Sequence, residues 1–318
     1  MNFKKIFSYL KETYQEWSND DAFEKSSSIA YYSVFSLPGL LIIVVTVATL
    51  IWSPEYVERV ITDEIGGAMG GDAAEQVQTM LQNSRQESNS TFALIVGIAT
   101  LVFGATGVFS QLQKSLNDAW EVELDPDAGI KQTVLSRVTA LGIILALAFL
   151  LIVSLLLSSV LSAINGWLEQ LLPGIPTFIF FVVNNLVSIV VLTALFALMF
   201  KVLPDADVEW RSVKWGALLT AVLFTIGKFL LGFYFGQSDP GATFGAAGSI
   251  ILIMLWVYYS SLIMLFGAEF TQVYARHHGH RLKPSEHARY NAEYRLKQQQ
   301  KEAKGTIPEY PELGNAKR

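Results

Sequence analysis

Residues 240 to 268 read PGATFGAAGSIILIMLWVYYSSLIMLFGA, a run without a single Asp, Glu, Lys or Arg. A helix needs about 20 apolar residues to cross the roughly 30 Å hydrocarbon core of a bilayer. This run is long enough, and four more uncharged runs lie at residues 26–54, 88–113, 138–168 and 170–200. The pattern predicts an all-α, polytopic membrane protein.

The composition agrees with this class. Of the 318 residues, 52% are hydrophobic and only 16% are charged, whereas a typical soluble domain has about 25% charged residues. The chain contains no cysteine, which excludes a disulfide framework and a thiolate nucleophile. The first apolar run follows a charged segment, so we expect no cleaved signal peptide.

We place six transmembrane helices by the extent of the apolar runs. Pro38 lacks an N–H and clashes with the preceding turn, so it predicts a kink or a separate turn over residues 30–37. The expected spans cover residues 30–52, 92–113, 138–163, 177–201, 213–236 and 247–273.

The distribution of Lys and Arg predicts the orientation. The N-terminal segment, the second and fourth connections and the C-terminal tail carry four, three, three and ten basic residues. The first connection has only Arg59 and Arg85, and the third and fifth connections have none. Basic flanks remain in the cytoplasm, so we expect both termini to be cytoplasmic.

Three segments outside the spans have their own patterns. Residues 1–28 predict an amphipathic helix that either packs on the transmembrane domain (29–275) or lies in the cytoplasmic leaflet. The acidic connection 53–91 predicts two short external helices separated by glycines. Residues 276–318 predict a basic, largely disordered cytoplasmic tail with a helical start. The apolar face of the first segment consists of Phe3, Phe7, Leu10, Tyr14 and Trp17.

No familiar catalytic motif is present. The four histidines lie in the tail at 277, 278, 280 and 287, with no carboxylate or thiolate at ligand spacing. There is no phosphate-binding loop and no Ser-His-Asp order. We therefore expect no enzymatic activity, no metal site and no cofactor.

Polar residues within the predicted spans are the candidate pathway residues, because such groups are costly in hydrocarbon and tend to mark a route for solute. Lys228 either reaches the outer interface with its long side chain or faces an internal cavity. Asn184 and Asn185 need partners from other helices or water. These three residues and Tyr234 are the candidates for lining a pathway.

A second set of candidates is structural. Gly232 and Gly236 have the spacing of close helix packing, and Gly245 and Gly248 follow in the next connection, where they could form a hinge. Glu269 lies near the cytoplasmic end of the last span, where Arg276, Lys201 or Arg211 could pair with it. Pro38 and Asp205 complete this set.

Several short motifs together resemble the YihY/BrkB family of bacterial membrane proteins over about residues 20 to 275. The last helix begins with Phe244-Gly245-Ala246-Ala247-Gly248, where the family typically has Tyr-Gly-Ser-Leu-Gly. The matching motifs are Ala30-Tyr31-Tyr32-Ser33-Val34-Phe35-Ser36-Leu37-Pro38, Leu203-Pro204-Asp205, Trp210, Trp215-Gly216-Ala217-Leu218, Leu255-Trp256-Val257-Tyr258 and Gly267-Ala268-Glu269-Phe270.

The resemblance implies a six-helix inner-membrane protein with both ends in the cytoplasm. Family members have been labelled ribonuclease BN, but a nuclease needs metal-binding carboxylates or a positioned histidine pair, and these residues do not provide them. The basic tail suits anionic lipid headgroups at least as well as non-specific nucleic acid. We expect the lipid bilayer as partner and no specific nucleic acid.

Two functional hypotheses follow. The first is a transporter or exporter of a lipid-like or small anionic solute, with the pathway residues lining its cavity. The second is a structural or assembly protein of the cell envelope that transports nothing.

Overall fold

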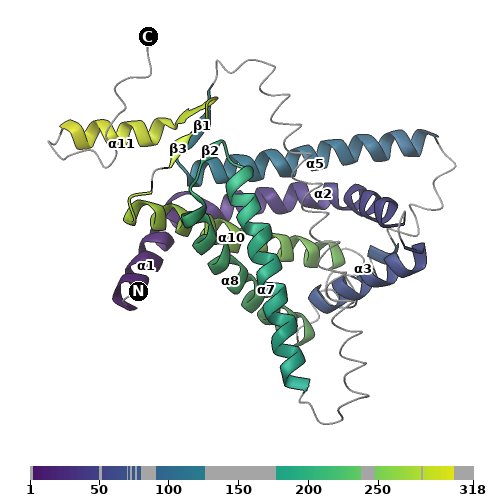
Figure 1. Cartoon of the computed structure of the whole chain (residues 1–318). Helices are drawn as coiled ribbons and strands as arrows, with labels where there is room; N and C mark the ends of the chain where they lie inside the picture. Colours follow the sequence, from purple (N-terminus) through teal and green to yellow (C-terminus); the bar gives the residue numbers. More distant parts are fainter. Residues whose placement is uncertain are drawn as a thin grey trace.

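The computed structural model describes residues 3–49, 52–69, 71, 74–75, 77–79, 91–125, 177–237, 248–280 and 282–303. Long helices dominate this part of the chain (Figure 1). The helices are α1 (Phe3–Asn19), α2 (Ala22–Ala48), α3 (Pro54–Met69), α5 (Thr91–Ala119), α7 (Thr177–Val202), α8 (Trp210–Gln237), α10 (Gly248–His277) and α11 (Ala292–Ala303). The strands are β1 (Val122–Leu124), β2 (Ala206–Asp207), β3 (Lys283–Pro284) and β4 (Ala288–Tyr290).

Three helices of the described chain are long and apolar enough to cross a membrane, over Asn185–Val202, Trp210–Tyr234 and Ile250–His277. They correspond to the predicted spans 177–201, 213–236 and 247–273. Helices α2 and α5 occupy the predicted spans 30–52 and 92–113, and the predicted span 138–163 lies outside the described residues. The chain is thus a mostly helical membrane protein.

Helices α2 and α5 lie side by side (Figure 1). Helix α2 is continuous through Pro38, so residues 30–37 do not form the separate turn that the proline suggested. A Cβ at Gly104 would overlap the Ser36 backbone, and one at Gly107 would overlap the Tyr32 ring. Glycine at these two positions is what allows the helices to approach so closely.

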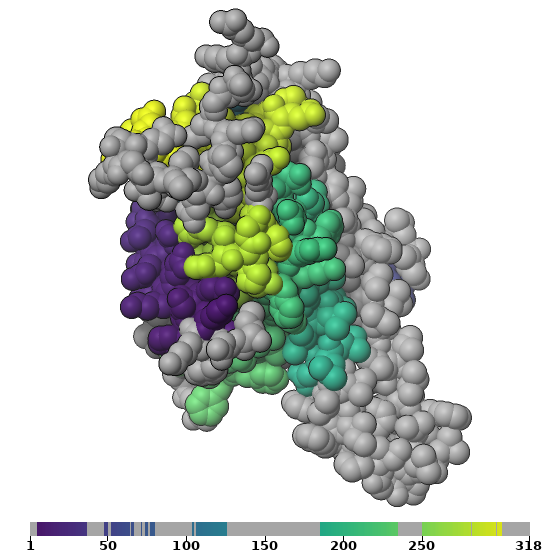
Figure 2. Space-filling view, turned by 60° about the vertical axis from the view of Figure 1, so that its left-hand side comes forward, coloured from purple at the N-terminus to yellow at the C-terminus, as the bar shows by residue number. Residues whose placement is uncertain are grey.

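Helix α1 packs along α10 (Figure 2). Tyr9 and Trp17 are buried on this side, and the Trp17 indole N–H donates a 3.1 Å hydrogen bond to the Leu262 carbonyl. Phe7 and Tyr14, which the sequence placed on the same apolar face, are exposed. A turn after Asn19 divides the segment 1–28, and α2 begins at Ala22, so only the first part of the predicted helix forms α1 and only part of its predicted apolar face packs inward. The packing on α10 supports the first of the two interpretations.

Four short strands and α11 gather at the end of the bundle where α1 lies, which we call the capped end (Figure 1). Strand β1 pairs antiparallel with β4, and β2 pairs antiparallel with β3. We expected a largely disordered tail from residue 276, but residues 282–303 form β3, β4 and α11. Residues 283–290 are ordered because they add strands to connections between helices, a pairing that their own polar composition does not reveal.

The connection after α2 contains α3, as predicted for its first half. Val57 on α3 is buried, as are Ala74 and Val77 farther along the chain. Most of the second predicted external helix lies outside the described residues.

Candidate functional site: a carboxylate-lined pocket

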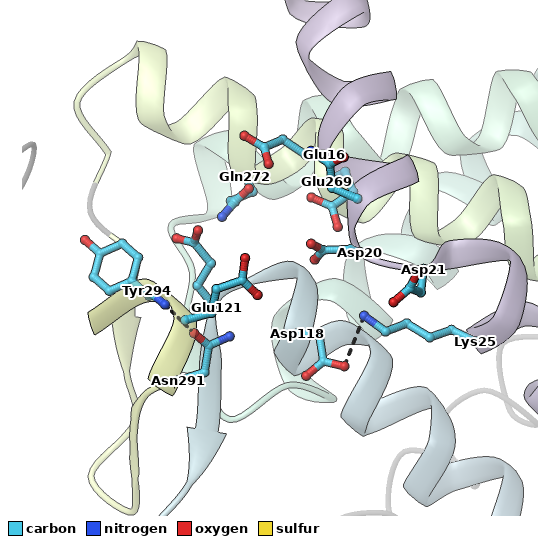
Figure 3. A pocket seen from close by; sticks show the side chains of 12 residues that line it. Glu16, Asp20, Asp21, Lys25, Asp118, Glu121, Glu269, Gln272, Asn291 and Tyr294 are labelled. Carbon is cyan, nitrogen blue, oxygen red and sulfur yellow. Dashed lines mark hydrogen bonds and ion pairs between the residues drawn. The ribbon is translucent and has the colours of Figure 1, made fainter. Parts of the chain in front are cut away.

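A pocket with a volume of about 250 Å³ opens at the capped end (Figure 3). All twelve residues that line it are polar, with seven carboxylates against a single lysine. They come from α1, the turn before α2, the first turn of α2, the end of α5, α10 and the start of α11. They are Glu16, Asn19, Asp20, Asp21, Lys25, Asp118, Glu121, Glu269, Gln272, Asn291, Glu293 and Tyr294.

The turn between α1 and α2 forms one wall of the pocket. Asp21 has φ 52°, in the left-handed region that Asp and Asn tolerate better than most residues. The chain turns here, and Asp20 and Asp21 lie directly before the beginning of α2. From there the Lys25 ammonium forms a 3.0 Å ion pair with Asp118 at the end of α5.

The facing wall comes from α10. Glu269 and Gln272 are three residues apart, which places them on the same face of the helix, and both line the pocket. Their side chains are only 3% and 6% exposed. The carboxyl group of Asp20 lies within hydrogen-bonding reach of Glu269. Figure 3 shows the carboxyl groups of Asp20 and Glu269 next to each other at one side of the pocket.

The third wall joins the end of α5 to the tail. Glu121 takes a left-handed conformation, φ 55°, as the chain leaves α5 and enters β1. Its carbonyl accepts a 2.9 Å hydrogen bond from the Asn291 N–H. The Asn291 side chain accepts a 2.8 Å bond from the Tyr294 N–H and so caps α11. The strand pairing of the tail thereby completes the pocket.

Burial acts on the carboxyl group of Asp20. Desolvation raises the pKa of Asp20 above its ordinary value, and the charges of Glu293 and Glu16 add to this effect. Lys25 and the hydrogen bond with Glu269 oppose it. Burial thus makes the ionised form of Asp20 costly in the folded protein.

Two of the three basic residues expected near Glu269 have other partners. Arg276 pairs with Glu12 at 3.1 Å and with Glu16 at 3.3 Å. Lys201 pairs with Asp207 at 2.6 Å. The charges closest to Glu269 are those of Asp20, Lys25 and Glu16 instead. The expectation was wrong because the turn after α1 approaches this part of α10, a contact that local sequence does not encode.

Of the predicted pathway residues, Lys228, Tyr234 and Asn185 do not line this pocket. Lys228 is exposed on α8, as are Phe229 and Tyr234. Asn185 is half-buried on α7, and the side chain of Asn184 lies outside the described residues.

The predicted structural residues have separate roles. The Asp205 carboxylate accepts bonds from Asn117 at 2.8 Å and Gln113 at 3.1 Å, and the Asp205 N–H donates to Asn117 at 2.8 Å. Desolvation raises the pKa of Asp205, although these two amides oppose the rise. Asp205 thus ties the connection between α7 and α8 to the end of α5.

The glycines predicted to pack or hinge are less uniform. A Cβ at Gly232 would meet no described atom within 4 Å, so none of the described helices packs closely against this position. Gly236 lies near the end of α8 and Gly248 begins α10, whereas Gly245 lies outside the described residues.

The tail histidines contact different partners. His277 bonds to Glu12 at 2.7 Å, His280 bonds to Ser212 at 2.8 Å, and His278 stacks on Tyr274. Among the described residues, no group of three His, Asp or Glu side chains is arranged to hold a metal ion.

Comparison with known proteins identifies the family. The model of the family described as "Virulence factor BrkB" matches residues 13–291. The chain belongs to the BrkB family. This match confirms the resemblance read from the sequence motifs.

The BrkB-family relatives include proteins of different lengths. "Putative ribonuclease-like protein YfkH" of Bacillus subtilis is 26% identical over 266 residues, covering 82% of this chain and 93% of that protein. "UPF0761 membrane protein PSPA7_4558" of Pseudomonas paraeruginosa is 27% identical over 253 residues, covering 78% of this chain and 58% of that protein. This chain therefore spans somewhat more than half of the Pseudomonas relative. No solved structure matches the chain.

Sequence reasoning singled out only one residue of the pocket, Glu269, and gave it a structural role. Most of the others lie in turns or in the tail, where polar residues are ordinary. The available signal was weak: Glu269 and Gln272 are polar residues one helical turn apart at the end of a span.

Proposed function

We propose that this chain is a non-enzymatic membrane transporter and that the carboxylate-lined pocket is where solute binds before it crosses. The observation that carries the proposal is Glu269, an ionisable residue 3% exposed at the end of an apolar helix and facing a polar pocket. Ionisable residues on spanning helices are costly, and they commonly mark solute or ion pathways. A purely structural bundle has no need of such a group.

The orientation follows from the charge pattern. The capped end carries α1, α11 and the connection from α7 to α8 with Lys201, Arg211 and Lys214, and such basic flanks favour the cytoplasmic side. In a bacterium the chain would then lie in the inner membrane with the pocket open to the cytoplasm. Solute would enter the pocket from that side, and the direction of transport would be export.

The charge of the pocket bears on the solute. Seven carboxylates and one lysine attract cations and repel anions. This arrangement argues against the small anionic cargo suggested by Lys228, and its fully polar lining argues against the acyl part of a lipid. A small, polar solute that carries no net negative charge fits the pocket best.

Flux through proteoliposomes tests transport directly. Vesicles holding the full chain would be loaded with one of four probes: labelled spermidine, glutamate, sucrose or a fluorescent phospholipid. We expect at least one probe to move faster than in protein-free vesicles, and Glu269→Gln to slow it. Glu286→Gln, an exposed carboxylate outside the pocket, is the matched control. If no probe moves faster, the assembly role replaces the transport role.

A further inference from the structure

We infer that the pocket at the capped end is a binding site for an organic cation with two or more amino groups, of the polyamine class. The inference rests on the proposed function, because both require the pocket to admit solute. It goes further by naming the chemical class of that solute.

The first observation is the placement of charge. Lys25 is the one basic residue among the twelve that line the pocket, and its ammonium is already paired with Asp118. Glu16 forms an ion pair with Arg276, which is not one of the twelve lining residues. Asp20 and Glu269 face each other at one side of the space, where ionising both carboxyls brings two like charges together. A bound cation would relieve this repulsion.

The second observation is Gln272, which is independent of the carboxylates. Its side chain is 6% exposed and lines the pocket, yet it hydrogen-bonds to none of the described residues. Figure 3 shows the amide extending from α10 into the space between Glu121 and Glu269. Its amide atoms are not sealed from solvent but open to the pocket, so a ligand amino group would replace water there and donate a hydrogen bond to the amide oxygen.

The spacing favours amines over a metal ion. A metal needs several oxygen ligands converging within about 2.0–2.6 Å of one point, and no such group of three occurs among the described side chains. The carboxylates instead surround about 250 Å³ from several different elements. A ligand with several ammonium groups, each a hydrogen-bond donor, could place them against carboxylates that lie apart from one another.

Equilibrium dialysis of labelled spermidine against the detergent-purified full chain tests the inference. We expect saturable binding that Glu269→Gln and Gln272→Leu each weaken about tenfold or more, the typical effect of losing a hydrogen bond to a charged group. Asp21→Asn is a further pocket variant, because Asn tolerates the left-handed φ of 52°; it should weaken binding severalfold. Glu286→Gln should bind as the wild type does.

Several results would overturn the inference. These are the absence of saturable spermidine binding, equal binding in the pocket variants and the control, or displacement of spermidine by an equal concentration of Mg²⁺. Spermidine binding without flux would refute the proposed transport and keep the site. Flux of sucrose or glutamate without spermidine binding would refute the site and keep transport.

Discussion

Gly267 on α10 lies so close to Thr220 on α8 that a Cβ at position 267 would overlap the threonine hydroxyl. The contact has a counterpart one turn away, where Gly216 on α8 meets Thr271 on α10 in the same manner. Each threonine donates its hydroxyl to the glycine carbonyl of its own helix, at 2.7 Å for Thr220 and 2.8 Å for Thr271. Small residues therefore lock the two helices at close range.

Gly267→Ala should lower the apparent melting temperature in detergent, because the new methyl group forces α8 and α10 apart. Overpacking of this kind costs about 1–3 kcal/mol, more than the roughly 1 kcal/mol that alanine gains in helix propensity. Gly232→Ala is the matched control, since a Cβ there would meet no described atom within 4 Å, and it should leave the melting temperature unchanged or raise it. A Gly267→Ala protein as stable as the wild type would refute the close contact.

Asp205→Asn should remove the part of the pH dependence of stability that comes from the Asp205 carboxyl group. The pKa of Asp205 is raised in the folded protein. At a pH just above the ordinary pKa of Asp, the folded state therefore binds more protons than the unfolded state. The free energy of unfolding falls as pH rises through the raised pKa. An asparagine cannot titrate, yet its carbonyl still accepts the bonds from Asn117 and Gln113. The melting temperature of the variant relative to the wild type should therefore increase between about pH 4 and pH 7. A constant difference over that range would contradict the assignment.

The absence of cysteine makes topology directly measurable. Single-cysteine variants Thr79→Cys, after α3, and Glu286→Cys, between β3 and β4, each carry one thiol at an exposed position. We expect a membrane-impermeant maleimide to label Thr79→Cys in intact cells and Glu286→Cys only after permeabilisation. Labelling of Glu286→Cys in intact cells would place the pocket on the opposite side.

Lys228→Ala tests whether the pathway predicted from the sequence and the pocket found in the structure have separate roles. The lysine is exposed on α8 and does not line the pocket, so we expect spermidine binding to be unchanged. A loss of flux without a loss of binding would assign Lys228 to a later part of the pathway. Unchanged flux would remove it from the mechanism.

The long helices were predictable because apolar length alone distinguishes a spanning segment. Helices α2, α5, α7, α8 and α10 all lie at expected positions. The Gly267–Thr220 contact was not predictable, since the sequence does not specify which helix a small residue will face. The order of residues 282–303 was also missed, because β3 and β4 gain their stability from partners in β2 and β1.

The pocket was hidden from sequence analysis for the same reason. Asp20 and Asp21 resemble a solvated turn, and Asn291 resembles any polar residue in a charged tail. They become a site only because α1, α10 and the tail meet at the capped end. Glu269 was noticed as a charge beside an apolar run, but its neighbours come from the other end of the chain.

Charge-selective modification of Gln272→Cys tests the central claim most directly, because this variant would carry the only thiol of the chain. The purified protein would react in turn with a cationic and an anionic methanethiosulfonate, each rate divided by that of a free thiol in solution. A negatively charged pocket that admits solute should react at least about tenfold faster with the cationic reagent, and salt should reduce this preference. Equal rates, a faster anionic reaction or no reaction with either reagent would contradict the account.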